Sequence, residues 1–172
     1  MVDKTLSYLD YLKLLDLLKQ YSSTPYSHEI ISDLRPLETL DQIKARQDNI
    51  EAVLEAIKWD GNIPLSDIPD IRDDLKRINL IDFVLEAGDF LRIAFFLKAC
   101  DDILRFLKKI RNKKPYIIKI VESLKPLSLL YSKIFKTVNA EGFIEDTASY
   151  ELSKIRADLF VYKERIRKQL ER

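Results

Sequence analysis

Side chains that could carry chemistry are few and scattered in this sequence. Nucleotide hydrolysis would need a glycine-rich phosphate loop with Lys and Ser or Thr, but the three glycines, Gly61, Gly88 and Gly142, stand far apart. The only histidine, His28, has no second histidine for a zinc site and forms no evident pair with a cysteine, so we interpret it as a surface residue. The sequence therefore predicts no catalytic, metal-binding or cofactor-binding residue, and we do not expect this segment to be an enzyme.

Two pairs of neighbouring aspartates are the remaining candidates for a metal site. Asp73-Asp74 and Asp101-Asp102 lie in predicted helices, where adjacent side chains point in different directions. We interpret both pairs as solvated helix faces. Trp59 and the eight tyrosines are interpreted as packing residues and not as platforms for base stacking.

Positive charge is concentrated in the second half of the chain, although the net charge is only +1. Residues 1–97 hold 11 Lys and Arg against 18 Asp and Glu, whereas residues 98–125 hold nine against three and residues 149–172 hold seven against four. Such a local excess could neutralise the phosphates of a nucleic acid, with weak binding that fades steeply as salt is added. It could equally be a solubilising face at a helix end. The candidate nucleic-acid contacts are Lys108, Lys109, Arg111, Lys113, Lys114, Lys163 and Arg167.

The elements that would position these side chains are almost all helices. Apolar residues at helical spacing predict helices over residues 6–21, 27–34, 39–58, 71–78 and 86–111, with a loop over 59–69. Thr39 and Gln42 have the spacing of a capping box, and Pro115 and Pro126 suit the starts of two shorter helices. The 86–111 helix is apolar around its circumference, which is typical of a central core element. Residues 136–145 predict a β-hairpin turning at 139–142.

The last predicted helix begins after Ser149, a suitable N-cap, and carries an apolar seam. The seam residues follow at spacings of 3, 4, 3, 4 and 4, which is typical of a coiled coil. They are Leu152, Ile155, Leu159, Tyr162, Ile166 and Leu170. No glycine or proline stops the pattern before Arg172. The seam could be buried inside the domain against the first helices, or it could form the root of a longer antiparallel arm, and we favour the arm.

The length and composition of the chain are typical of one globular domain with a hydrophobic core. Hydrophobic residues make up 47% and charged residues 33% of the 172 residues. The single cysteine, Cys100, is expected to be a small buried residue, and no signal peptide or membrane-spanning run is found in the sequence. These features predict an all-α, cytoplasmic protein with no membrane contact, consisting of a helical domain over 1–148 and the first part of a coiled-coil helix over 149–172.

Several motifs resemble the bacterial MutS family, in the branch of its second paralogue. The sequence DTASYELSKIR at residues 146–156 is similar to the DSASPELRRIR-type start of the clamp helix in that branch, and IPLSDIPDI at residues 63–71 is similar to its PLGGIPDI loop. Residues 85–107 resemble its long ARFLRAARRLKRFL-type helix, and residues 12–57 follow its opening pattern. The chain departs from the branch where Ser66-Asp67 replaces two glycines, where Tyr150 replaces a proline, and at His28.

This resemblance implies a non-catalytic N-terminal core and lever segment that ends at the start of a clamp. The family's ATPase domain, with its ATP and magnesium, and its Smr nuclease domain would lie outside these residues. The resemblance also implies a dimer that binds branched or mismatched DNA in repair and recombination control, and in some members an association with stalled ribosomes. The alternative interpretation is a stand-alone interaction module that dimerises through the seam at residues 152–170.

Overall fold

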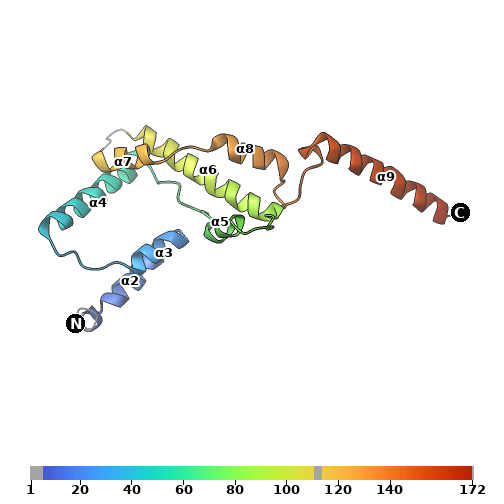
Figure 1. The fold of residues 1–172 in the computed structure, drawn as a ribbon. Helices are drawn as coiled ribbons and strands as arrows, with labels where there is room; N and C mark the ends of the chain where they lie inside the picture. Colours follow the sequence, from blue (N-terminus) through green and yellow to red (C-terminus); the bar gives the residue numbers. More distant parts are fainter. Residues whose placement is uncertain (1–5, 111–113, 172) are drawn as a thin grey trace. The chain divides into compact units, whose positions relative to one another are not determined.

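The computed structural model describes residues 6–110 and 114–171, and in these ranges the chain is helical with no β-sheet (Figure 1). The all-α class predicted from the sequence is therefore confirmed. The elements are α2 (Tyr11–Gln20), α3 (Pro25–Ser32), α4 (Leu40–Asp60), α5 (Arg72–Ile78), α6 (Ala87–Lys109), α7 (Pro115–Ser123), α8 (Ser128–Thr137), the 3₁₀ turn η1 (Asp146–Ala148) and α9 (Tyr150–Leu170). No described helix is both long and apolar enough to cross a membrane.

Side-chain caps lie at the starts of α3, α4 and α9, and a proline lies at the start of α7. The Thr39 hydroxyl accepts from the backbone N–H of Gln42 at 3.3 Å, which is the first half of the predicted capping box. A complete capping box, which the sequence analysis missed, joins Thr24 and Ser27 at the start of α3. Pro115 occupies the first turn of α7, where its missing N–H leaves no hydrogen bond unmade.

The chain forms two compact units, which are described separately. The first unit consists of Met1–Asp70 and Phe95–Leu127. Its buried core joins α4 to the end of α6 and to α7, and two alanines of α4, each 2% exposed, allow close packing. The core residues are Ala52, Ala56, Leu107, Ile110 and Ile117.

The second unit consists of Ile71–Ala94 and Ser128–Arg172. Its smaller core contains Ala94 from α6 and Ile134 and Val138 from α8 and its end. Helix α6 thus contributes buried residues to both cores, in keeping with its apolar circumference. The predicted boundary at residue 148 stays a prediction.

The predicted β-hairpin over residues 136–145 was wrong. Helix α8 continues through Thr137, so only Val138 and Ile144 form an isolated antiparallel bridge. The turn between them is still closed by Asn139, whose N–H donates to the Phe143 carbonyl at 2.8 Å, and Gly142 has a φ of 82°. The local turn signal was correct, but the adjoining helix left too few residues for paired strands.

Asp67, in the loop between α4 and α5, has a φ of 57°, which lies in the left-handed region. Its position is one of the two at which the pattern that residues 63–71 resemble has glycine, and aspartate is enriched among the non-glycine residues that adopt this conformation. The backbone at Asp67 is therefore compatible with that resemblance.

Candidate functional site

The predicted N-cap of α9 is confirmed. The Ser149 hydroxyl accepts from the backbone N–H of Leu152 at 3.1 Å, and Glu151 lies in the first turn. This cap satisfies one of the amides that the helix start leaves unpaired, and the acidic side chain faces the positive end of the helix dipole.

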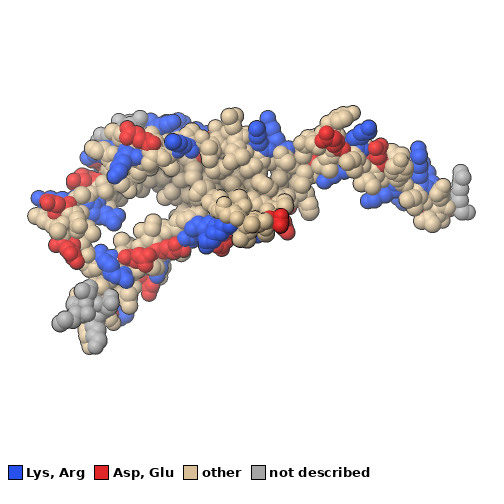
Figure 2. Space-filling view, viewed as in Figure 1, with Lys and Arg blue, Asp and Glu red and all other residues tan. Residues whose placement is uncertain are grey.

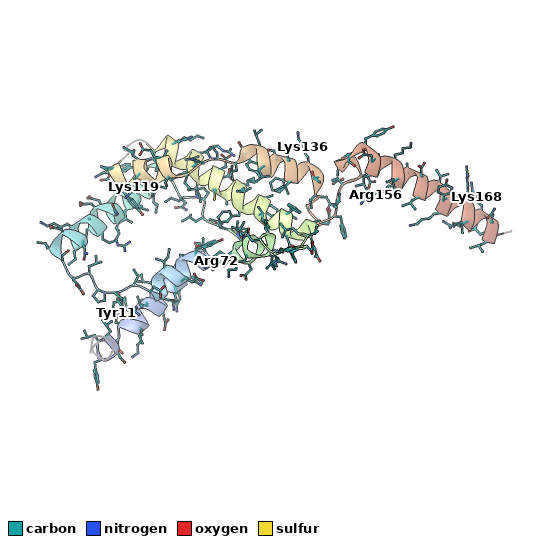
Figure 3. The ribbon with its side chains drawn as sticks, in the orientation of Figure 1. Tyr11, Arg72, Lys119, Lys136, Arg156 and Lys168 are labelled. Atoms are coloured by element: carbon teal, nitrogen blue, oxygen red, sulfur yellow. The ribbon has the colours of Figure 1, made fainter. Side chains whose placement is uncertain are left out.

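A joint formed by Asp146, Ile144 and Arg156 holds the base of α9. The Arg156 guanidinium donates from Nη1 to the Ile144 carbonyl at 2.9 Å and forms an ion pair with the Asp146 carboxylate. Figure 3 labels Arg156 in the first part of α9 and Lys168 near its end. The first and last residues of the DTASYELSKIR motif therefore contact each other, so this motif encodes the connection between η1 and α9.

The seam of α9 is exposed along most of its length. Leu152 is half-buried, whereas the other five members have more than half of their surface exposed. Their exposed fractions are 56% for Ile155, 51% for Leu159, 58% for Tyr162, 56% for Ile166 and 81% for Leu170. At about 100° per residue these side chains form a stripe about 80° wide, as a coiled-coil face would.

The candidate basic residues of α9 border this seam on one side. Lys163 and Arg167 are both exposed, and Arg167 also donates from Nε to Glu171 at 3.1 Å. Lys and Arg side chains are visible along the length of α9 (Figure 2). An exposed apolar stripe with a basic border suits either a partner helix or a polyanion.

The basic stretch of the first unit is partly neutralised by its own carboxylates. Lys114 lies 3.4 Å from Glu55 and 4.0 Å from Glu51, all measured between charged side-chain atoms. Lys108 and Lys109 are exposed at the end of α6, and the structure records no ion pair for either among the described residues. They are therefore the strongest candidates of this stretch.

The remaining two candidates, Arg111 and Lys113, lie outside the described residues. Lys108, Lys109 and Lys114 belong to the first unit, and Lys163 and Arg167 belong to the second. The interpretation of all seven as nucleic-acid contacts stays a prediction.

The interpretation of the aspartate pairs as solvated faces was wrong for one member of each pair. Asp74 is 3% exposed and accepts from Arg92 at 3.1 Å to Nε and 2.7 Å to Nη2, and it also pairs with Arg77. Asp89, 6% exposed, pairs with the same two arginines and accepts from the Glu86 N–H at 3.0 Å. Asp101, 9% exposed, binds Arg105 at 2.7 Å.

Arg77, Arg92, Asp74 and Asp89 thus form a charge cluster between α5 and α6, in which the two carboxylates are buried and the two guanidinium groups are partly exposed. The Arg92 hydrogen bond lowers the pKa of Asp74 against the opposing effect of burial. Burial opposes ionisation of Asp89 as well, but the Glu86 N–H and both arginines together lower its pKa. A repeated Asp-x-x-Arg spacing in both helices could have revealed this cluster. In the described part of the chain, no group of three or more His, Cys, Asp or Glu is placed to hold a metal ion.

Three single residues differ in how their exposure agrees with the prediction. Trp59 is 65% exposed with the Lys58 ammonium 5.0 Å from its ring centre, so its interpretation as a packing residue was wrong. His28 is exposed, as expected for a surface residue. Cys100 is half-buried, not fully buried, and burial raises the pKa of its thiol.

Known relatives are consistent with the motifs at the base of α9. No protein-family model matches the chain. The chain is 27% identical over 171 residues to the endonuclease MutS2 of Aquifex aeolicus, covering 99% of this chain and 22% of that protein. It is 30% identical over 170 residues to the MutS2 endonuclease of Latilactobacillus sakei (97% and 22%), and 28% identical over 174 residues to a putative MutS2 endonuclease of Bacillus subtilis (99% and 22%). The chain is therefore related to the MutS2 endonucleases, and it spans about a fifth of the length of the curated relatives that it matches.

Proposed function

We propose that this chain is the non-catalytic core and lever segment of a MutS-type DNA-binding protein, and that it positions a clamp arm beginning with α9. The observation that carries the proposal is the joint of Asp146, Ile144 and Arg156, because Asp146 and Arg156 are the first and last residues of the motif that resembles the clamp start. The similarity to MutS2 endonucleases along 99% of the chain supports the same assignment.

The joint suits a lever because a single side chain, Arg156, connects α9 to both Ile144 and Asp146 in the segment before it. The Ser149 cap fixes the first turn of α9, and Arg156, two turns into the helix, bonds back to the Ile144 carbonyl. A movement of the turn would therefore be transmitted to α9 as a rigid-body rotation, as in hinge transitions of other proteins.

The second part of the proposal is that exposed basic residues contribute to binding of branched or mismatched DNA. Lys108 and Lys109 end α6 in the first unit, and Lys163 and Arg167 border the seam in the second. Contacts of this kind act on phosphates through counterion release, so they add affinity without reading sequence.

Fluorescence anisotropy with a labelled four-way DNA junction tests this part of the proposal. The junction, a mismatched duplex and a matched duplex are titrated with the 172-residue chain between about 50 and 200 mM salt. We expect the double variants Lys108→Glu/Lys109→Glu and Lys163→Glu/Arg167→Glu to weaken binding and each to reduce the salt slope by about two.

The matched control is Lys13→Glu/Lys44→Glu, which changes the charge equally at exposed positions of α2 and α4. If this control weakens binding as much as the two test variants, the effect is one of net charge and the assigned contacts are wrong. Tighter binding to ribosomes than to the junction, measured by competition, would reassign the polyanion to RNA.

The exposed seam supports a second candidate function, a module that pairs with another helix through α9. The large exposed fractions of Ile155, Leu159 and Ile166 are the observation that favours it, because such a stripe is usually covered in a stable helix. Light scattering after size-exclusion chromatography tests it: association that is lost in Leu159→Asp/Ile166→Asp supports pairing, and a strictly monomeric chain at high concentration refutes it.

A further inference from the structure

The first turn of α6 is bound to α5 by a side chain that also fixes the helix start. Asp89, which is 6% exposed, uses its two carboxylate oxygens for different partners. Oδ2 accepts from the backbone N–H of Glu86 at 3.0 Å, which is a capping bond at the start of α6. Oδ1 accepts from Arg77 of α5 at 3.0 Å and from Arg92 of α6. Asp89 therefore fixes where α6 begins relative to α5.

Helix α5 is attached to α6 mainly by charge. It has seven residues, all of them described, and the buried one is Asp74. Arg92 donates to Asp74 at 3.1 and 2.7 Å, and Arg77 binds the same carboxylate. A helix this short is not stable by itself, and few buried apolar contacts hold it in place. The position of α5 therefore depends on the charge cluster.

The turn after α8 lies against the same first turn of α6. A Cβ atom built on Gly142 would come 3.9 Å from the Cα atom of Gly88, so the two backbones approach each other closely where neither residue has a side chain. Ile144 and Ala87 line one cavity of about 250 Å³. Figure 1 shows the segment after α8 reaching the start of α6 before α9 begins. Because Gly88 directly precedes Asp89, the turn contacts the part of α6 that Asp89 fixes.

The same turn holds the base of α9. Asn139 closes it twice: its backbone N–H donates to the Phe143 carbonyl at 2.8 Å, and its side-chain oxygen accepts from the Phe143 N–H at 2.8 Å. Ile144 follows, and its carbonyl accepts from Arg156 of α9 at 2.9 Å. The contacts therefore run without a gap from α5 through the start of α6 and this turn to α9.

We infer that α5 sets the position of α9, and that Asp89 is the positioning residue that connects them. Release of α5 from the charge cluster would free the start of α6, and the turn seated on it would lose its fixed support. All of these contacts lie within the second unit. The inference rests on the proposed function, because it makes α5 the element that controls the clamp arm, but the coupling itself is measurable without nucleic acid.

Hydrogen exchange of the 172-residue chain, measured by mass spectrometry in the absence of DNA, tests this coupling. Arg92→Met removes the hydrogen bonds from Arg92 to both aspartates. We expect exchange to become about five-fold faster in residues 139–145 and in residues 150–156, which is the low end of the coupling found between sites in other proteins. Faster exchange that is confined to residues 72–94 would overturn the inference.

The double change Arg92→Met/Arg156→Met separates coupling from a general loss of stability. Arg156 makes the last contact of the path, so in the Arg156→Met background Arg92→Met should still speed exchange in residues 139–145 but have no further effect in residues 150–156. General destabilisation of the unit would instead speed exchange in residues 150–156 by the same factor in both backgrounds. That result would also overturn the inference.

Asp89→Asn is measured alongside as a second variant. Asparagine has one acceptor oxygen, so it cannot bind the Glu86 N–H and the arginines at the same time. We expect the same two segments to exchange faster, and the same dependence on Arg156. Far-ultraviolet circular dichroism checks the helix content of every variant, and Asp89→Asn decides the result if Arg92→Met does not fold.

Arg105→Met is the matched control, because Arg105 lies on the same helix and binds a buried aspartate, Asp101, at 2.7 Å, but belongs to the first unit. We expect it to leave exchange in residues 139–156 unchanged. An equal acceleration there would show that any lost ion pair on α6 acts on α9, and the role of Asp89 would be wrong. Absent coupling with intact DNA binding overturns this inference alone, whereas coupling without DNA binding overturns only the DNA-binding part of the proposed function.

Discussion

The charge cluster between α5 and α6 allows a stability prediction that separates a buried ion pair from an exposed one. The change is Asp74→Asn, which removes one negative charge at nearly constant volume. Asp74 is 3% exposed and receives two hydrogen bonds from Arg92, at 3.1 and 2.7 Å. Asparagine keeps only one of the two acceptor oxygens, so the change removes the charge that faces two arginines and places an N–H donor where Asp74 accepted from an arginine.

The expected cost at neutral pH is about 1–3 kcal/mol in the free energy of unfolding. Removing one partner of a fully buried ion pair costs about 3–5 kcal/mol, and exposed pairs contribute about 0–1 kcal/mol. The Arg92 side chain is 47% exposed, so water screens the unpaired guanidinium, and Asp89 remains as a second partner. Both facts place the expected cost below that of full burial.

The pH dependence follows from the lowered pKa values of Asp74 and Asp89. A carboxyl group with a lowered pKa in the folded chain stabilises it fully above the unfolded value of about 3.9. This stabilisation is lost as the pH falls through the folded pKa. The difference between the unchanged chain and Asp74→Asn should therefore be constant at neutral pH and shrink below about pH 4.

Hydrogen exchange measured by mass spectrometry on peptides from residues 72–94 is the appropriate assay. Exchange in these peptides reports on the cluster itself, whereas Trp59 lies in the other unit. The matched control is Asp73→Asn, because the Asp73 side chain is 89% exposed and pairs with Lys76 at 3.0 Å. We expect the control to cost less than about 0.5 kcal/mol. Equal acceleration of exchange in the two variants would refute the buried-pair reasoning.

Two further predictions concern the base of α9. Ser149→Ala should destabilise the first turn of α9 by about 1 kcal/mol because it removes the cap. Ser149→Asp is the control, because aspartate retains an acceptor for the helix amide. Unchanged hydrogen exchange in residues 150–156 of Ser149→Ala would contradict this prediction. Arg156→Met should speed exchange in residues 144–156, at a cost on the order of 1 kcal/mol, since the methionine stem packs but donates no hydrogen bond. Lys154→Met serves as its control, and equal exchange in both variants would show that the joint does not hold α9.

The sequence predicted those parts of the fold that depend on neighbouring residues. Thr39 and Ser149 were identified as caps because the groups that they bind lie three residues away. Pro115 marked the start of α7 for a similarly local reason. Helix starts of this kind follow from backbone geometry and need no knowledge of tertiary packing.

Features that depend on distant residues were missed. Asp74 and Arg92 are 18 residues apart, so no local pattern predicted that the Asp74 carboxylate would be buried. Trp59 was assigned to packing from its residue type alone, although a large aromatic side chain can also remain exposed at the surface. The prediction of a hairpin was wrong because the turn residues, although recognised correctly, did not show where α8 would end.

The seam of α9 was predicted from the sequence only in part. Helical spacing identified the stripe, but the same spacing in α2 produced Leu15 at 3% exposure and Leu12 at 58%, so spacing alone does not determine what covers an apolar face. Exposure does not determine it either, since Phe160 lies outside the seam and is 67% exposed. Removal of apolar seam residues, as in Leu159→Asp/Ile166→Asp, therefore reports whether the seam is covered and not which surface covers it.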